Sequence, residues 1–506
     1  MSQNDPNLAD DVATLHRMGY AQELSRNMGK FSNFAISFSI ICILSGGINS
    51  LAQGTSGAGG GALGIGWLVG GAVALLFALG MAQISSAFPT AGGLYHWSSI
   101  LGGRFWGWLT AWMNLLGLIT VLAAINVGAY LFFIGAFGPT LGIQDTFTNK
   151  VVFMVVVTGL HALINHLGIK ATTRLTDFSG YLILIGATLL IFALLAFAPS
   201  YDFSRLWTFT NYSGDAGGGV WPQTSSMGMI FMLGLLLPIY TLTGYDASAH
   251  TSEETIDASR NVPKGIIHSV FWAALFAWLF SCAFVLAIPN MDEAAKQGWN
   301  VFFWTLDQTM PFGLKMGLYG IIFVAQFICG LATVTSVSRM IFAFARDDGL
   351  PFSSTLKVVS PKWRTPVAAI WTGSALAVAF VTYAEAYSTV VSVTAIALYL
   401  SYAMPIAAGL FAYGNKWTEM GPWNMGPGFR IVAILCVMAS LAIFYVGVQP
   451  PNELALTVLG WIALITAAAW FGIERRRFKG PPTGAEIAHR QAEIAAAEVV
   501  VGQASA

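Results

Sequence analysis

The chain has 506 residues, of which 9% are charged and 56% are hydrophobic, and its formal net charge is zero. A soluble protein of this length carries about a quarter charged residues, because its surface faces water. The composition therefore excludes an ordinary soluble enzyme and a disordered protein, and the lack of a basic excess excludes a nucleic-acid binder. We expect the chain to lie in a lipid bilayer.

A membrane helix needs about 20 mostly apolar residues. We predict about twelve such spans, which in chain order are Ser32–Gln53, Ala62–Phe88, Phe105–Phe137, Val151–Leu167, Leu175–Phe197, Met227–His250, Ile266–Ile288, Leu314–Ala345, Pro366–Tyr383, Val390–Tyr413, Gly428–Val448 and Leu454–Ile473. Only a short hinge at Glu385 divides the ninth from the tenth. The prediction is an all-α membrane domain over residues 32–474, between an N-terminal segment 1–31 and a tail 475–506.

The distribution of Lys and Arg predicts the orientation, because positively charged loops stay in the cytoplasm. If both termini are cytoplasmic, only Lys150, Arg205, Lys296 and Lys315 fall on the outer side. The opposite orientation would invert this ratio. We therefore predict an integral protein of the cytoplasmic membrane with both termini inside the cell.

The first and sixth spans contain residues that break helices. The first carries Gly46 and Gly47 in its middle, and the sixth carries Pro238 and Gly244. Glycine and proline favour local unwinding, and in lipid a helix unwinds only where it lines a cavity or packs against protein. The alternative is that the paired glycines only permit close helix packing.

The spacing of these two breaks predicts a transporter. They lie in matching positions of two successive groups of five spans, and because five is odd the groups have opposite topology. Paired interrupted helices in an inverted repeat indicate a substrate site near the middle of the membrane. Asp246 is the one carboxylate well inside a span, and such a residue is a functional candidate. Its alternative role is that of an aspartate at the level of the lipid headgroups.

Enzyme chemistry is a poor fit to this sequence. The four cysteines lie singly in apolar runs, which argues against a zinc site or a disulfide framework. His161 and His166 have a spacing that places them on different helix faces, and no HExxH, GxSxG or P-loop pattern is present. We expect no enzymatic activity, no metal and no cofactor apart from a possible coupling ion.

Three motifs, each following a predicted span, resemble the amino acid–polyamine–organocation superfamily of secondary transporters. They are Ser86–Tyr95, the acidic Ser252–Glu254 with Arg260–Lys264, and Arg339–Pro351 with Thr365–Pro366. Gly19–Arg26, Phe34–Ser39 and Gly244–His250 resemble its amino acid/choline branch, which includes GABA permeases and choline carriers. The resemblance implies the LeuT-type fold of two inverted five-helix repeats plus two extra helices.

The two breaks suggest how a zwitterion would bind. The backbone N–H groups of Gly46, Gly47 and Ile48 and the hydroxyl of Ser45 suit a carboxylate. The carbonyl groups of the sixth span suit an amine, and their residues are Tyr240, Thr241, Leu242 and Thr243. Tyr240 stands where relatives place an aromatic gate, although it is equally a candidate for simple packing. No Lys or Arg lies in either break to balance a second carboxylate on the substrate, so a neutral zwitterion fits better than a dicarboxylate.

Coupling to an ion is assigned to two groups of side chains. Asp246 is neutral when protonated, and when ionised it could hold sodium or the amine of a substrate. Thr333 and Ser336 share a face of the eighth span, with Thr335 between them, and relatives use such a hydroxyl pair for sodium. The alternative is that these hydroxyls bond to the preceding turn of their own helix.

The predicted function is secondary active transport of an amino acid or a related amine such as GABA by alternating access, coupled to protons or sodium. The alternatives are an uptake carrier for choline or ethanolamine and, less well supported, a membrane-embedded enzyme. A passive channel lacks the rings of like charge that a selective pore needs. The expected partners are a small zwitterion or amine and the lipid bilayer, and these features predict no oligomeric state.

Overall fold

The computed structural model describes residues 6–383, 387–482 and 485–504, and within these residues the regular elements are helices. The uninterrupted long apolar helices are α8 (Arg104–Leu141), α9 (Phe147–His166), α10 (Ile169–Ala196), α14 (Ala258–Ala287), α17 (Phe312–Arg346), α20 (Tyr387–Ala412) and α21 (Gly428–Gly447). Three more spans are composite: α2 (Lys30–Ile41) with α3 (Gly46–Asn49), α5 (Gly60–Gly64) with α6 (Gly66–Ala87), and α22 (Glu453–Ala469) with the turns that follow it.

Two shorter apolar stretches complete the set. One consists of α11 (Met227–Gly234) and α12 (Leu236–Thr241), which α13 (Ala247–His250) follows after a break, and the other is α19 (Val367–Tyr383). The prediction of about twelve spans in an all-α membrane fold is thus confirmed. The hinge predicted at Glu385 lies outside the described residues.

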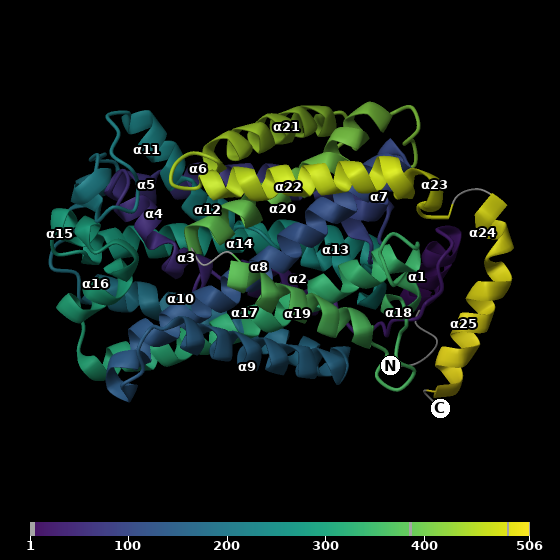
Figure 1. Cartoon of the computed structure of the whole chain (residues 1–506), viewed down its shortest axis with the longest axis horizontal. Coiled ribbons are helices and arrows are strands. Elements are labelled where there is room, and N and C mark those ends of the chain that lie inside the picture. Colours follow the sequence, from purple (N-terminus) through teal and green to yellow (C-terminus); the bar gives the residue numbers. More distant parts are fainter. Residues whose placement is uncertain (1–5, 384–386, 483–484, 505–506) are drawn as a thin grey trace.

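The remaining helices are short and lie between or beyond the spans. They are α1 (Pro6–Arg17), α4 (Leu51–Thr55), α7 (Gly93–Gly102), α15 (Met291–Lys296), α16 (Val301–Thr309), α18 (Ser353–Leu356), α23 (Arg475–Arg477), α24 (Ala485–His489) and α25 (Gln491–Ala504). Figure 1 shows α15 and α16 at one end of the molecule, with α1, α18, α24, α25 and both chain termini at the other.

The outer surface is apolar. Phe192 of α10, Met438 and Leu441 of α21, and Leu464 of α22 each expose more than half of their side-chain surface. Exposed apolar patches of this extent are rare on soluble monomers, whereas side chains of this kind face hydrocarbon in a membrane. The chain is therefore an integral membrane protein.

The helix packing supports the predicted inverted repeat. In an inverted repeat, each of the first five spans corresponds to the span five places later, so each packed pair should have a corresponding packed pair. The pair α2–α10 matches α12–α20, α2–α14 matches α12–α6, and α8–α20 matches α17–α10. The pairs α6–α14 and α8–α17 map onto themselves. Helices α21 and α22 stand outside this exchange and pack on α20, where Figure 1 shows them side by side along one flank.

The two breaks meet in the middle of the molecule, where α3 packs on α12. Gly244 lies just after α12 with a φ of +88°, and a Cβ there would lie 2.2 Å from Cγ2 of Ile40. Only glycine fits both this backbone conformation and this space. At Gly46 a Cβ would lie 3.0 Å from Oγ1 and 3.2 Å from Cα of Thr241, so the backbones approach closely because the residue is a glycine.

Candidate functional site

A small closed cavity lies between the two broken helices. Five of the eight residues predicted to bind substrate line it, namely Ser45, Gly46, Tyr240, Thr241 and Thr243. The cavity volume is about 10 Å³, which is room for about one water molecule. The lining side chains are buried. The site is thus closed and too small for an amino acid until the surrounding helices move.

The other walls of the cavity come from residues that the sequence analysis did not single out. Ile40 and Ile41 belong to α2, and Val121 and Ile125 belong to α8. In the sequence these four are ordinary apolar residues of long spans, so no local signal distinguishes them from residues that face lipid. They make part of the cavity wall apolar, and the polar part comes from the backbone and hydroxyl groups of the breaks.

The backbone N–H groups at the first break are partly occupied. Gly46 donates to the carbonyl of Cys42 at 3.2 Å, and Ile48 donates to the carbonyl of Ser45 at 3.2 Å. Among the described residues the N–H of Gly47 has no hydrogen-bond partner. Of the three donors predicted for a carboxylate, Gly47 is therefore the one left free.

At the second break, side chains occupy two of the four predicted acceptors. The hydroxyl of Thr243 donates to the carbonyl of Tyr240 at 2.8 Å, and the hydroxyl of Tyr399 donates to the carbonyl of Leu242 at 3.2 Å. The carbonyl of Thr241 accepts no hydrogen bond within the described part of the chain, and its buried hydroxyl also lacks a partner there. Thr241 thus offers a free carbonyl and a free hydroxyl next to Gly46.

Two donors from α17 face the unwound end of α2. Nε2 of Gln326 donates to the carbonyl of Leu44 at 2.9 Å, and the thiol of Cys329 donates to the carbonyl of Ile40 at 3.2 Å. Neutral side chains therefore occupy two of the carbonyl groups that the break releases. Gln326 could have been noticed in the sequence as a polar residue inside an apolar span.

The hydroxyls predicted for sodium are engaged differently from one another. Thr333 donates to the carbonyl of Cys329, one turn earlier in its own helix, and Thr335 donates to Oδ1 of Asn165 in α9 at 2.7 Å. Oγ of Ser336 is buried with no partner among the described residues. None of the three bonds to Asp246 in the described structure.

Asp246 lies apart from the cavity, in a polar cluster between α8, α13 and α20. It accepts hydrogen bonds from Nδ2 of Asn114 at 2.9 Å and from the hydroxyl of Tyr402 at 3.0 Å, and Nε2 of His250 lies 3.3 Å from its Oδ2. Asn114 precedes Val121 by seven residues, which is about 10 Å along α8. Its three partners were not predicted, although each is a polar residue in an otherwise apolar span.

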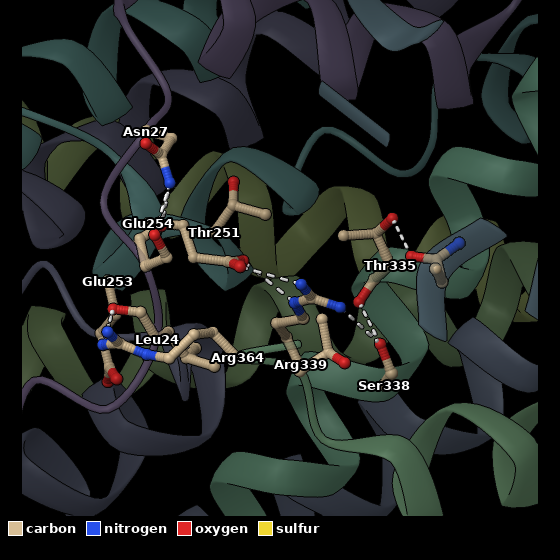
Figure 2. A network of polar contacts seen from close by, with 12 residues as sticks. Leu24, Asn27, Thr251, Glu253, Glu254, Thr335, Ser338, Arg339 and Arg364 are labelled. Carbon is tan, nitrogen blue, oxygen red and sulfur yellow. Dashed lines mark hydrogen bonds and ion pairs between the residues drawn. The ribbon is translucent and has the colours of Figure 1, made fainter. Parts of the chain in front are cut away.

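Beyond Asp246, toward the end that holds the termini, two buried ion pairs join the loop after α13 to the end of α17. Arg339 binds Glu254 through two hydrogen bonds of 3.0 and 2.8 Å, as Figure 2 shows, and Arg346 binds Glu253 through two of the same lengths. Burial raises the pKa of Glu253, but the charge and hydrogen bonds of Arg346 and the N–H of Ala91 outweigh it and hold this pKa below its usual value.

The N-terminal segment covers these ion pairs. The backbone N–H groups of Asn27 and Met28 both donate to the carbonyl of Glu254, and Nε2 of Gln22 donates to that of Glu253. Arg364, which follows α18, donates to the carbonyl of Leu24. Together these contacts close the molecule between the cavity and the end that holds the termini.

Comparison with known proteins identifies similar chains. Residues 28–470 match the family model described as amino acid permease. The chain is 32% identical to the amino-acid permease BAT1 of Arabidopsis thaliana over 92% of its own length and 95% of that relative, and 32% identical to a BAT1 homolog of Oryza sativa over 93% and 95%. It is 28% identical to amino-acid permease 2 of Neurospora crassa over 93% and 88%.

Proposed function

This chain belongs to the amino acid permease family, and we propose that it carries a neutral amino acid through the cavity between its two broken helices by alternating access. It is an amino acid transporter and not an enzyme, as the sequence predicted. The superfamily resemblance is confirmed as well, while the narrower amino acid/choline branch stays a prediction.

The observation that carries the proposal is a set of free polar groups at the two breaks: Thr241 lines the cavity, and the N–H of Gly47 belongs to the residue next to Gly46, which also lines it. The N–H of Gly47 suits the carboxylate of an amino acid, and the free carbonyl of Thr241 suits its ammonium group. The hydroxyl of Thr241 adds a donor, because it is buried without a partner among the described residues. Buried polar groups in proteins normally find a partner, so these atoms favour a polar ligand.

The cavity favours a zwitterion over the alternatives predicted from the sequence. None of the described residues that line it is charged, so neither a second carboxylate nor an isolated cation would be balanced there. A carrier for choline or ethanolamine would be best served by an anion at the cavity, whereas Asp246 bonds elsewhere and only the ring of Tyr240 remains to face a cation. A neutral amino acid, including GABA, therefore fits better than an organic cation.

Closure on both sides supports alternating access. The cavity is sealed and holds about one water molecule, so substrate enters only after α3 and α12 separate. The ion pairs Arg339–Glu254 and Arg346–Glu253 close the route toward the termini. The distribution of Lys and Arg supports placing this end in the cytoplasm, with the protein in the cytoplasmic membrane.

For the coupling ion we favour a proton over sodium. Nε2 of Gln326 and the thiol of Cys329 already donate to two carbonyls at the first break, which leaves fewer oxygens there for sodium, and the hydroxyls of Thr333, Thr335 and Ser336 have no carboxylate bonded to them among the described residues. Sodium prefers several oxygen ligands at once. Asp246 needs only a proton to become neutral.

Counterflow in proteoliposomes tests the proposal. Vesicles loaded with an unlabelled compound take up the same radiolabelled compound, and we expect saturable uptake for L-alanine or GABA and none above empty vesicles for choline or ethanolamine. Saturable counterflow of choline alone would move the function to the alternative class. Absence of counterflow for every amino acid in a panel of the twenty standard ones plus GABA would overturn the proposal.

A further inference from the structure

Asp246 and His250 form a buried pair with a hydrogen-bond pattern that can be assigned atom by atom. They are four residues apart along α13, and neither has exposed side-chain surface. Nδ1 of His250 lies 3.1 Å from the carbonyl oxygen of Ala91. A carbonyl oxygen only accepts hydrogen bonds, so Nδ1 carries a hydrogen. The other ring nitrogen, Nε2, faces Oδ2 of Asp246 at 3.3 Å.

The partners of the carboxylate are fixed in the same way. The oxygen of Tyr402 accepts from the N–H of Gly244 at 3.0 Å, so its own hydrogen goes to Oδ1 of Asp246. The hydroxyl of Ser401 donates to a backbone carbonyl, so Asn114 must donate through Nδ2 both to Ser401 and to Asp246. Each carboxylate oxygen thus already accepts one hydrogen bond.

One hydrogen remains to be placed between Oδ2 of Asp246 and Nε2 of His250. Without it two acceptors would face each other at 3.3 Å and repel. With it the pair is either a carboxylic acid beside a neutral imidazole or a carboxylate beside an imidazolium. In both forms the pair is neutral, whereas loss of the hydrogen leaves one net negative charge.

We propose that Asp246 and His250 together are the proton-binding site that couples this transporter to a proton gradient. A proton from water adds to Nε2 or Oδ2 and is later released to water from the same atoms, so no other bond forms or breaks. The neutral, loaded pair can be enclosed in the membrane at low cost, but the charged, empty pair cannot. Release therefore requires the surrounding helices to open. This inference rests on the proposed function.

The charged groups of α17, which packs on α13, are already paired: Arg339 binds Glu254 and Arg346 binds Glu253. No Lys or Arg bonds to the pair among the described residues, and α8 presents Asn114 while α20 presents Tyr402. Facing groups farther out are Tyr245, whose ring contacts that of Tyr402 at a tilt of 46°, and His96 of α7, which bonds to Thr90. Burial, and then the charge of Arg346, lower the pKa of His96 to about 3, so His96 stays neutral.

The residue that binds His250 through its carbonyl, Ala91, also binds the ion pairs that close the molecule. The N–H of Ala91 donates to Oε1 of Glu253 at 3.0 Å, while its carbonyl accepts from His250. Glu253 in turn binds Arg346, and the arginines of α17 pair with Glu253 and Glu254. A change at the proton site therefore has a direct route, His250 to Ala91 to Glu253, to the contacts that must break for opening.

Proton movement during transport is the first test. In vesicles that contain a pH-sensitive dye, L-alanine uptake by the wild type is expected to move protons in the same direction. An inward pH gradient of about one unit should raise alanine accumulation about tenfold for one proton per substrate. The variants His250→Asn and Asp246→Asn should lose both effects and retain alanine counterflow, while His268→Asn, at an exposed position of α14, should behave as the wild type.

The outcomes separate this inference from the proposed function. Net L-alanine uptake by the wild type without proton movement, or gradient-driven accumulation that survives in His250→Asn, would overturn the proton site and leave the transporter assignment intact. Loss of all counterflow in the wild type would overturn the function. A second measurement is the infrared spectrum of purified protein during a pH titration. We expect one protonation step in the wild type that is missing from both His250→Asn and Asp246→Asn. Two independent steps would contradict a shared proton.

Discussion

The most informative single residue of the site is Gly46. Its missing side chain lets α3 approach Thr241, where a Cβ would lie 3.0 Å from Oγ1 and 3.2 Å from Cα. The neighbouring Gly47 has no such restriction, since a Cβ there would lie 3.9 Å or more from its neighbours. The two glycines therefore have different roles, close approach at Gly46 and a free N–H at Gly47, which their adjacency in the sequence does not reveal.

We expect Gly46→Val to weaken substrate binding. The added side chain would enter the contact between the breaks, and overpacking of this kind costs about 1 to 3 kcal/mol, equivalent to about 5- to 150-fold in affinity. Binding of L-alanine to purified protein, measured calorimetrically, would show the loss. Gly317→Ala in α17 is the matched control, because its Cβ would meet no atom within 4 Å. Unchanged affinity in Gly46→Val would show that the break is not where substrate binds.

At the scale of elements, two buried ion pairs join the α13–α14 loop to the end of α17. Glu253 and Glu254 are fully buried and each binds an arginine through two hydrogen bonds. Removing one partner of a buried ion pair leaves the other charge uncompensated, which costs about 3 to 5 kcal/mol. The N-terminal segment, which bonds to the same loop, adds to this closure.

We therefore expect Glu253→Gln to lower the free energy of unfolding of the purified protein by about 3 kcal/mol or more, and with it the melting temperature. We also expect this variant to favour opening toward the termini. Lys357→Gln is the control, because its bond to Asp348 is exposed and such pairs contribute little. The pKa of Glu253 is held below its usual value, so its stabilising effect is present above about pH 4 and is lost on further acidification. The acid-side loss of melting temperature should thus be smaller in Glu253→Gln. Equal melting curves for wild type and variant would contradict this role.

At the scale of the whole molecule, both ends of the chain lie together. The carboxylate of Glu498 in α25 accepts from the N–H of Gln22 at 2.9 Å and lies 2.7 Å from Nε2 of His16. This is the end that holds the buried ion pairs, as Figure 1 shows for the termini. An even number of spans places both ends on the same side of the membrane, as the structure does, while their placement in the cytoplasm stays a prediction.

The fold was predictable because lipid imposes strong constraints on sequence. Span length, the two breaks and their spacing of five helices are properties of local composition, and the packing pairs follow the repeat that they implied. Val121, Ile125, Asn114 and Tyr402 could not be assigned in the same way. They belong to α8 and α20, which are buried on most sides. The face of such a helix that meets a break is set by packing, which cannot be read from a single sequence.

Asp246 illustrates the same difference within one residue. Its location inside a span was evident from the sequence. Its position outside the cavity, in the polar cluster between α8, α13 and α20, was not. His250, four residues later, could have been paired with it from helical spacing alone. The sequence thus indicated that a titratable group lies in the membrane but not which partner shares its proton.

The central claim is that substrate occupies the space beside Thr241 and reaches it from both sides in turn. Its most direct test is the accessibility of Thr241→Cys, in a chain without its four native cysteines that retains counterflow, to a membrane-impermeant thiol reagent. We predict modification from either side of the membrane, slowed by saturating L-alanine in both cases. Modification from one side only, or at a rate that substrate does not change, would contradict the account.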